Sequence, residues 1–438
     1  MIAKEDVNKL QPFQARSIIE QLRKGSVPIK YVPLFTVGRK NWLTFIEDDL
    51  EHYIGKGGSK VRFISGDYGD GKTHFMSVIK HLAMKKGFAV SFVVLTREVP
   101  IHKFETVYQT IVNQLQGDFK GTGIRNMLDK WLENLALTMP AHGQKNKAQK
   151  DEAQKERVAL ADKFRNIPGM DINFANALAA LINNRFAPLP HEEKEKRDAD
   201  QEVLFHWFEG GKVTKRELKP FYIYEFLNKA NSKQFMNSLI LFLHHIGHKG
   251  LILLLDEMET VMGQSTSIRN AAYENVRLLI DNSESSQYLH IFFSIIPDIL
   301  MSEKGFKSYD ALWSRVRSIG ESRKLNYRGV LVDIHQTPLK TDELVDLGRC
   351  LRTIHGISYR WDPMDLVSDE LMEKICTNQK RMGVISEVRL FIKQLIHILD
   401  MAEQGQTPED MDMGKQIVET RQEMEAEKME QLQPSWDT

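Results

Sequence analysis

Residues 66–73 have the types and the spacing of a phosphate-binding loop. The segment is Gly-Asp-Tyr-Gly-Asp-Gly-Lys-Thr, a glycine and four residues followed by Gly-Lys-Thr. Glycines let the backbone turn tightly and direct its N–H groups toward phosphate oxygens. In such a loop the lysine reaches the β- and γ-phosphates, where it can also assist catalysis, and the threonine hydroxyl binds Mg²⁺. We therefore predict that ATP and Mg²⁺ are bound here by Gly66, Asp67, Tyr68, Gly69, Asp70, Gly71, Lys72, Thr73 and His74.

The residues on either side predict the two elements that would hold this loop in place. Residues 61–65, Val-Arg-Phe-Ile-Ser, are typical of a strand that enters the loop, and residues 75–84 are typical of a helix that leaves it. The amino end of that helix would direct its dipole at the phosphates. The alternative is a plain glycine turn, which we disfavour because the strand–loop–helix context is what confirms the motif.

A second chemical feature follows an apolar run in the second half of the chain. Residues 251–255 are Leu-Ile-Leu-Leu-Leu, and Asp256 and Glu257 come directly after them. Such a run is typical of a buried central strand, and an open α/β sheet binds its ligand at the carboxyl ends of its strands. We predict that Asp256 holds Mg²⁺ together with Thr73, and that Glu257 is the general base for the attacking water. An acidic helix start is the alternative, which the upstream loop disfavours.

A further core strand is predicted over residues 290–296, and three polar candidates lie on it or after it. Ser294 could hydrogen-bond the γ-phosphate or the attacking water, although a tolerated hydroxyl within the sheet explains it equally well. Arg315 and Arg317 follow this strand. An arginine at such a position can enter the ATP site of a neighbouring subunit and stabilise developing charge. A surface arginine in a salt bridge is the alternative for both.

Two more candidate contacts to the nucleotide lie near the ends of the chain. Gly38 and Arg39 form a turn ahead of a predicted helix, and such a turn often meets the adenine end of the nucleotide in ATPases of the AAA+ and STAND types. A plain helix cap is the alternative. Arg389 falls in a helix predicted near residues 386–402, where an arginine of a lid could reach the γ-phosphate.

The composition excludes some classes of protein and leaves others open. The chain has 438 residues, with 59 Lys and Arg against 59 Asp and Glu, so that its net charge is +0. A DNA-binding face would therefore have to be local. The two cysteines, Cys350 and Cys376, lack metal-site spacing and suit a reducing compartment. The amino end lacks an apolar signal core, and no apolar run is long enough to span a bilayer, so we expect a cytoplasmic protein with no membrane partner.

The pattern of elements predicts an α/β fold in which a P-loop, AAA+-like parallel sheet is flanked by helices. We expect a further strand to lie in space between the strand before the P-loop and the strand before Asp256. Residues 104–116 are predicted to be helical, and residues 118–235 contain few strand-like runs. The predicted parts are an N-terminal helical segment (1–50), the two parts of the ATPase core (51–117 and 236–325), a helical insertion (118–235), a helical lid (326–403) and an acidic tail (404–438).

The chain resembles the ATP-binding proteins of bacterial BREX phage-resistance systems. The resemblance extends from about residue 10 to about residue 400, and the length suits the smaller BrxD type and not the much larger BrxC type. It implies a role beside a helicase or DNA-modifying proteins in phage defence. The segments that carry it are residues 66–75, 18–28 (Ile-Ile-Glu-Gln-Leu-Arg-Lys-Gly-Ser-Val-Pro), 37–39 (Val-Gly-Arg), 208–211 (Phe-Glu-Gly-Gly) and 250–259 (Gly-Leu-Ile-Leu-Leu-Leu-Asp-Glu-Met-Glu).

Two classes of function are consistent with these residues and with the resemblance. The first is a Mg²⁺-dependent ATPase that forms a homo-oligomer on DNA, on partner proteins or on both. The second is a STAND-like scaffold that binds ATP and hydrolyses little of it. Glu257 after Asp256 favours hydrolysis. A small basic cluster, Lys212, Lys215, Arg216 and Lys219, could contact DNA phosphates, although a solvated loop is the simpler interpretation.

Overall fold

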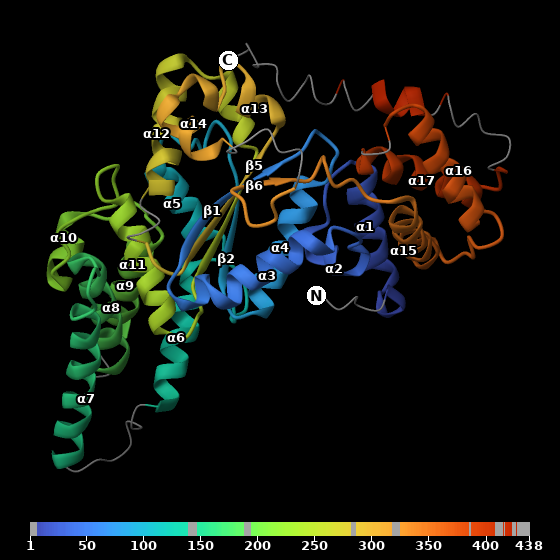
Figure 1. Ribbon diagram of the computed structural model, residues 1–438. Coiled ribbons are helices and arrows are strands. Elements are labelled where there is room, and N and C mark those ends of the chain that lie inside the picture. The colour runs from blue at the N-terminus through green and yellow to red at the C-terminus, as the bar shows by residue number, and fades with distance from the viewer. Residues whose placement is uncertain are drawn as a thin grey trace, which may run out of the picture.

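A six-stranded sheet forms the centre of the computed structural model, and helices cover both of its faces (Figure 1). The structure describes residues 7–138, 147–187, 194–281, 286–317, 325–384, 387–407, 415, 417–422 and 426. The strands are β1 (Ser59–Ser65), β2 (Ala89–Val94), β3 (Leu115–Gln116), β4 (Leu251–Asp256), β5 (Leu289–Ile295) and β6 (Leu331–Asp333). The helices are α1 (Pro12–Arg23), α2 (Val32–Phe35), α3 (Lys40–His52), α4 (Lys72–Lys85), α5 (Phe104–Asn113), α6 (Ile124–Thr138), α7 (Lys147–Arg165), α8 (Ile172–Phe186), α9 (Lys194–Phe208), α10 (Lys215–Leu218), α11 (Ser232–His245), α12 (Thr266–Asp281), α13 (Pro297–Met301), α14 (Asp310–Val316), α15 (Thr341–Tyr359), α16 (Asp369–Arg381) and α17 (Val388–Glu403).

The order of the strands agrees with the predicted α/β class. They lie in the order β3-β2-β4-β5-β1-β6, and all neighbouring pairs are parallel except β2 with β3. The predicted additional strand is β5, which lies between β1 and β4. The carboxyl ends of these three parallel strands therefore meet at one edge of the sheet, which brings the P-loop and the acids at the end of β4 together.

One predicted element ends earlier than its sequence suggests. The helix expected over residues 104–116 stops at Asn113, and Leu115–Gln116 form the short strand β3. These two residues pair antiparallel with Ser91 and Val90 on the open edge of β2. Leu115 is fully buried there, so hydrogen bonding to the sheet edge and burial of an apolar side chain replace the last helical turn.

The two faces of the sheet are covered by different helices because side chains alternate along each strand. On one face, apolar residues of β1, β4 and β5 such as Ile64, Leu254 and Phe292 pack against α3 and α4. On the other face, residues such as Phe63 and Phe293 pack against helices that include α5, α11 and α12. The sheet is therefore buried on both sides, as expected of parallel strands.

The described residues between β3 and β4 form helices, and the described part of 118–235 contains no strand. Figure 1 shows α6–α9 extending away from the sheet. The region is joined to the core by aromatic packing, in which Trp131 and Phe164 of the insertion contact Phe242 of α11 at 5.0 and 5.8 Å between ring centroids. A continuous apolar core therefore connects the insertion to the sheet.

The first and last helices of the described fold pack together. Figure 1 shows α1 and α2 beside the C-terminal helices α15–α17, and their apolar residues form one cluster. Asp400 of α17 accepts hydrogen bonds from Nη2 of Arg23 at 2.8 Å and from Nε2 of His355 at 2.9 Å. Burial acts to raise the pKa of Asp400, but these hydrogen bonds outweigh it and leave the pKa lowered. Part of the predicted N-terminal segment (α1 and α2) and part of the predicted lid (α15–α17) thus share one core, whereas α3 and the β6 segment pack in the core of the sheet.

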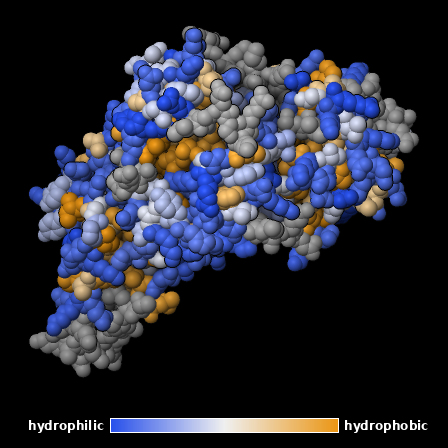
Figure 2. All heavy atoms as spheres, viewed as in Figure 1, coloured by the Kyte–Doolittle hydropathy of each residue, from blue (hydrophilic) through white to orange (hydrophobic). Residues whose placement is uncertain are grey.

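The surface and the tail complete the fold. Figure 2 shows a largely hydrophilic face on which apolar side chains gather in separate patches. Most of the predicted acidic tail, 404–438, lies outside the described residues, although Ile417 is buried against Val384 and Leu390. Within the described part of the chain, no helix has the length and apolar character needed to cross a membrane.

Candidate nucleotide-binding site

The P-loop has the backbone that its glycines predict. It connects β1 to α4, and Gly71, the residue before the helix, has a φ of 87°. Side chains other than hydrogen disfavour this left-handed region. Gly66 is required for a different reason, because a Cβ atom there would lie 2.7 Å from Cγ1 of Ile334. The amino end of α4 therefore faces the loop with its backbone N–H groups available to an anion.

Lys72 is held across the loop. Its Nζ atom donates to the carbonyl oxygens of Gly66 at 2.9 Å and Asp67 at 3.2 Å, and lies 5.2 Å from the centroid of the Tyr68 ring. The lysine is 8 % exposed and lines a cavity bounded by the P-loop, the acids at the end of β4 and the amino end of α17. The ammonium group is therefore positioned over the loop that would hold the phosphates.

Thr73 and Asp256 join the P-loop to β4. The Thr73 hydroxyl donates to Oδ2 of Asp256 at 2.7 Å, although the two residues are 183 positions apart. Asp256 is the last residue of β4 and is 3 % exposed. A hydroxyl and a carboxylate are oxygen ligands of the kind that Mg²⁺ prefers, so these two residues fit the predicted metal site.

Glu257 lies directly after Asp256 and lines the same cavity. Its backbone is in the left-handed region, with a φ of 61°, and its N–H donates to Oδ1 of Asp256 at 3.0 Å. Desolvation at the cavity wall raises the pKa of the Glu257 carboxyl, and the charge of Asp256 raises it further. A raised pKa and a place beside the metal-site residues suit a proton acceptor.

Glu259 is a third acid at this site, and sequence reasoning did not single it out as a site residue. It lines the cavity in the short 3-10 helix Met258–Gly263, is 7 % exposed and leaves Oε2 without a hydrogen-bond partner among the described residues. Burial raises the pKa of Glu259 to about 7. The only sequence signal is that three acids occur within the four residues Asp-Glu-Met-Glu, which does not say which of them is buried.

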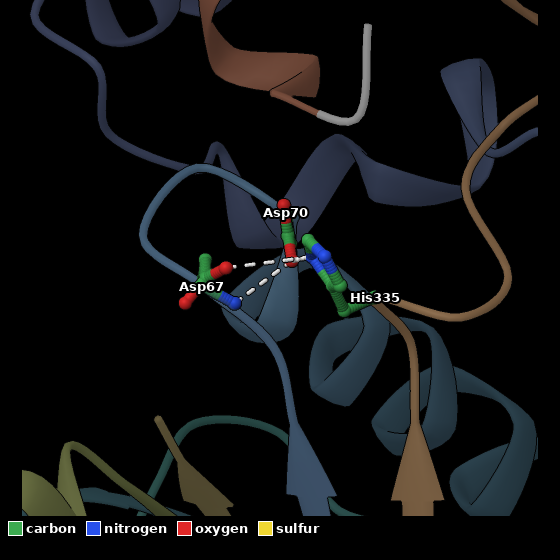
Figure 3. A group of neighbouring side chains, drawn as sticks. All are labelled: Asp67, Asp70 and His335. Carbon is green, nitrogen blue, oxygen red and sulfur yellow. Dashed lines mark hydrogen bonds and ion pairs between the residues drawn. The ribbon is translucent and has the colours of Figure 1, made fainter. Parts of the chain in front are cut away.

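Asp70, an acid within the P-loop, makes its polar contacts with other residues of the protein. Its Oδ2 atom accepts the N–H of Asp67 at 2.8 Å and lies 3.0 Å from Nδ1 of His335, which follows β6 (Figure 3). The carboxylate of Asp67 lies 3.5 Å from the same nitrogen. The hydrogen bond to Asp70 is the main cause of a raised pKa at His335. Asp70 thus connects two positions of the P-loop, and its contact with His335 connects the P-loop to the segment after β6.

The Gly38–Arg39 turn reaches the P-loop from the N-terminal side. Nη2 of Arg39 donates to the carbonyl oxygen of Asp70, and its guanidinium lies 5.9 Å from the Phe75 ring centroid. Burial lowers the pKa of Arg39 to about 10 and that of His74 to about 3. His74 is therefore neutral at pH 7, with Nε2 at 3.4 Å from the Thr36 hydroxyl. The cavity beside this turn is lined by apolar side chains that suit a base: Phe35, Val37, Leu339, Leu347, Val388 and Ile392.

Arg389 reaches the cavity from α17. Its backbone N–H donates to the carbonyl oxygen of Gly69 at 3.2 Å, and its side chain lines the cavity with Lys72 and Glu257. The C-terminal helices therefore contact the P-loop directly.

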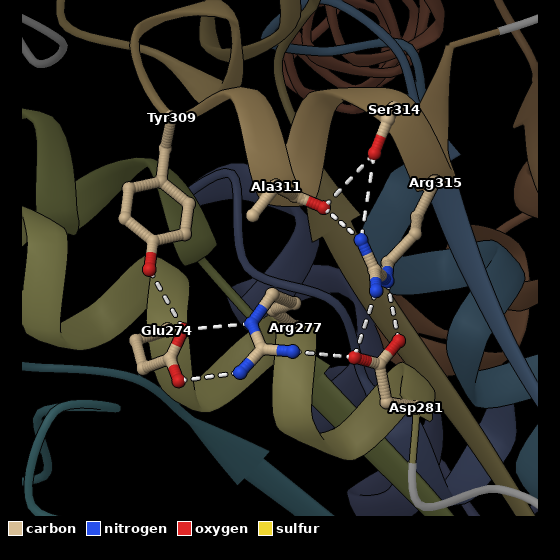
Figure 4. Close-up of polar contacts among 7 residues, drawn as sticks. All are labelled: Glu274, Arg277, Asp281, Tyr309, Ala311, Ser314 and Arg315. Carbon is tan, nitrogen blue, oxygen red and sulfur yellow. Dashed lines mark hydrogen bonds and ion pairs between the residues drawn. The ribbon is translucent and has the colours of Figure 1, made fainter.

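Ser294, Arg315 and Arg317 are not among the residues that line this cavity. Ser294 is fully buried in β5, opposite Ile64 of β1, and its hydroxyl has no partner among the described residues. Arg315 of α14 donates from Nη2 to Oδ2 of Asp281 at 3.0 Å (Figure 4). Arg317 is exposed directly after α14. The roles of these three residues stay predictions. For Arg315, the structure contains the salt bridge that was the alternative interpretation.

Comparison with known protein families gives a match over most of the chain. A family model described as "BREX system ATP-binding protein BrxC/D" matches residues 10–419. Comparisons with curated proteins and with solved structures found no match. The matched range includes the P-loop, the acids at the end of β4 and the helices α15–α17.

Proposed function

We propose a function for this chain from the premise that it belongs to the BREX system ATP-binding protein BrxC/D family, which implies an ATP-binding role in phage defence. Our proposal is that the protein is a Mg²⁺-dependent ATPase of AAA+-like type. The observation that carries it is the Thr73–Asp256 hydrogen bond, which joins the P-loop to an acidic strand end beside Glu257 and Lys72 in one cavity. ATP binding alone does not require a general base in this cavity, whereas ATP hydrolysis does.

The side chains around the cavity would have different roles in ATP hydrolysis. Lys72 and the N–H groups at the start of α4 would bind the phosphates, and Arg39 and the apolar wall would orient the rest of the nucleotide. Thr73 and Asp256 would hold Mg²⁺, which neutralises phosphate charge when bound. Glu257 would take a proton from the attacking water at its carboxylate. Arg389 would approach the phosphates from α17.

We further propose that ATP binding drives homo-oligomer formation on DNA or on other phage-defence proteins such as a helicase. Lys212, Lys215, Arg216 and Lys219 are all exposed on the insertion, and several copies aligned in an oligomer would add phosphate contacts. The STAND-like scaffold with little hydrolysis is the second candidate. It is favoured by the Arg315–Asp281 ion pair, which has to open before Arg315 can reach a neighbouring subunit.

Nucleotide affinity and steady turnover test the hydrolysis directly. We expect Lys72→Ala to abolish ATP binding, and Glu257→Gln to retain binding while turnover falls by about 100-fold or more, because a base acts only on the transition state. Glu195→Gln, at an exposed position of α9, is the matched control.

The assay is run with Mg²⁺, with EDTA and with added DNA. Turnover by Glu257→Gln at the rate of the unmodified chain would show that the base assignment is wrong. Tight ATP binding by the unmodified chain without turnover in any of these conditions would favour the scaffold.

A further inference from the structure

Two exposed tyrosines lie close together on the helical insertion, between the short 3-10 helix η5 (Lys219–Phe221) and α11. Tyr222 is 64 % exposed and Tyr224 is 65 % exposed, whereas Ile223 between them is 1 % exposed and packs into the main core. The isoleucine therefore anchors the segment while both aromatic rings face solvent. A pair of large exposed aromatic side chains is informative, because an aromatic ring gains free energy when it is covered.

The backbone that carries these tyrosines is fixed from the inside of the molecule. Nδ2 of Asn176 donates to the carbonyl oxygen of Tyr222 at 2.9 Å, and the N–H of Tyr224 donates to Oδ1 of Asn173 at 2.8 Å. Both asparagines belong to α8 and are nearly buried. Tyr222 is held with a φ of 59°, a conformation that is unfavourable for a residue with a bulky side chain. The two rings are thus presented on a rigid, strained support.

Four cations lie shortly before this pair of tyrosines in the sequence. Lys212, Lys215, Arg216 and Lys219 precede it on and beside α10 and η5, and all four are exposed. None of their side chains has an ion-pair or hydrogen-bond partner among the residues that the structure describes. The acid within this run, Glu217, accepts hydrogen bonds from the N–H and the hydroxyl of Thr214. The surface is therefore locally basic in a chain of zero net charge.

A cavity of about 290 Å³ opens beside Tyr222. Basic side chains line it together with the amide groups of several asparagines, and Nε of Arg165 donates to the same Asn176 that supports Tyr222, at 2.9 Å. The acid in its wall is Asp200, whose pKa is raised by burial. The polar and aromatic groups of this wall are Arg165, Asn176, Asn183, Asn184, Lys196, Arg197, Phe221 and Tyr222.

We propose that the surface formed by Tyr222, Tyr224, Lys215, Arg216 and Lys219, together with the adjoining cavity, is a binding site for single-stranded nucleic acid. Bases would stack on the two tyrosines, and the backbone phosphates would follow the cations. Amide groups in the cavity can donate to and accept from the edge of a base, which a paired base does not expose. The proposal rests on the DNA binding proposed above and names the form of DNA that this surface recognises.

The combination of exposed aromatic rings and cations favours single-stranded nucleic acid over a duplex or an acidic peptide as the ligand. A duplex keeps its bases stacked on one another, so two protruding rings would find no base face to cover. An acidic peptide would pair with the cations but would not require two flat aromatic faces. Figure 1 places α10 and α11 on the opposite side of the sheet from α15–α17, so this surface and the nucleotide cavity are separate parts of the molecule.

Binding of a labelled oligo(dT) of about 20 nucleotides to the full chain, without ATP, tests the site independently of ATP hydrolysis. We expect the double variant Tyr222→Asn, Tyr224→Ser to bind about tenfold or more weakly, because both stacking faces are removed. Asparagine at 222 tolerates the left-handed backbone, so the support is retained. Tyr222→Phe with Tyr224→Phe keeps both faces and should restore binding. Phe13→Ala removes another exposed aromatic ring, on α1, and is the control.

Salt dependence distinguishes the two kinds of contact. Arg216→Ala with Lys219→Ala should weaken binding and lower the slope of log affinity against log salt by about one for each cation removed. The tyrosine variants should leave this slope unchanged. Lys307→Ala, an exposed lysine on the 3-10 helix Phe306–Ser308, is the matched control for charge.

Three results would overturn the proposal. They are equal affinity for a duplex and a single strand, unchanged affinity of the tyrosine variants, and no binding of oligo(dT) at low salt. Each of these outcomes is independent of ATP turnover. If the chain hydrolyses ATP but does not bind single-stranded DNA, the proposed binding site is refuted and the proposed hydrolysis is not.

Discussion

At the scale of single residues, the three acids Asp256, Glu257 and Glu259 at the carboxyl end of β4 differ in environment although they are close in sequence. Asp256 is bound to the Thr73 hydroxyl, Glu257 occupies a left-handed position at the cavity, and Glu259 is buried with one oxygen unpaired. Neighbouring acids with different surroundings can hold different protonation states at one pH. Burial raises the pKa of Glu259 to about 7, which lies within the physiological range.

The pKa of Glu259 leads to a prediction about stability. Because its folded-state pKa of about 7 lies above the ordinary value of 4.5, the folded chain holds a proton there that the unfolded chain has lost. The free energy of unfolding should therefore fall as the pH rises from 4.5 to 7, by up to about 3 kcal/mol from this group. In Glu259→Gln this loss should be absent, so the variant gains stability relative to the unmodified chain as the pH rises.

Denaturant unfolding of the ATP-free chain across this pH range measures the difference. Glu195→Gln at the surface serves as the control and should follow the unmodified chain. Parallel pH profiles for the unmodified chain and Glu259→Gln would contradict a raised pKa at Glu259.

At the scale of elements, the P-loop is tied to the segment after β6 by the Asp70–His335 contact. The ring of His335 is half exposed, and its pKa is raised first by the hydrogen bond to Asp70. A raised folded-state pKa stabilises the folded chain fully below about pH 6.5, and this stabilisation is lost as the pH rises through the raised value. The tie between the loop and β6 is therefore strongest in mildly acidic solution.

Replacement of His335 tests this tie. We expect His335→Gln to lower the free energy of unfolding below about pH 6.5 by at most about 1 kcal/mol, because solvent screens a half-exposed pair. The difference from the unmodified chain should diminish as the pH rises. His206→Gln, an exposed histidine of α9, is the control. A constant difference at all pH values would indicate lost packing and not a lost charge.

At the scale of the whole molecule, the predicted arginine finger depends on how copies of the chain meet. Arg315 is paired with Asp281, which also pairs with Arg277, and Arg277 in turn pairs with Glu274 (Figure 4). The hydrogen bond from Arg315 holds the pKa of Asp281 below its usual value. The network fixes α14 on α12 within one copy, and an arginine that serves a neighbour has to leave it.

Mixed assemblies test whether Arg315 acts between subunits. We expect Arg315→Ala to cut turnover by about 1,000-fold while ATP binding is retained. Mixing it with Lys72→Ala should restore part of the activity, because the second variant supplies the arginine to an intact P-loop. Asp281→Asn is the control, since it breaks the same ion pair and keeps the arginine. Equal loss in Asp281→Asn would show that the pair is structural, and no restoration for either Arg315 or Arg317 would place the finger elsewhere.

The sequence determined the parts whose chemistry is contained in consecutive residues. The P-loop and the apolar strand ending in Asp256 are local patterns, because a tight turn, a helix start and a buried strand each require particular residues at fixed spacing. The parallel sheet, the intervening strand β5 and the helical nature of the insertion followed from the same periodicities.

Only the tertiary structure decided which distant residues complete the site. His335 lies 265 positions from Asp70, and α1 packs on α17 across nearly the whole chain. The burial of Glu259 and the exposure of Tyr222 and Tyr224 likewise depend on neighbours that are remote in sequence. Periodicity describes what one element can bury, but which surface it is buried against is set by long-range packing, and so the sequence alone left these contacts open.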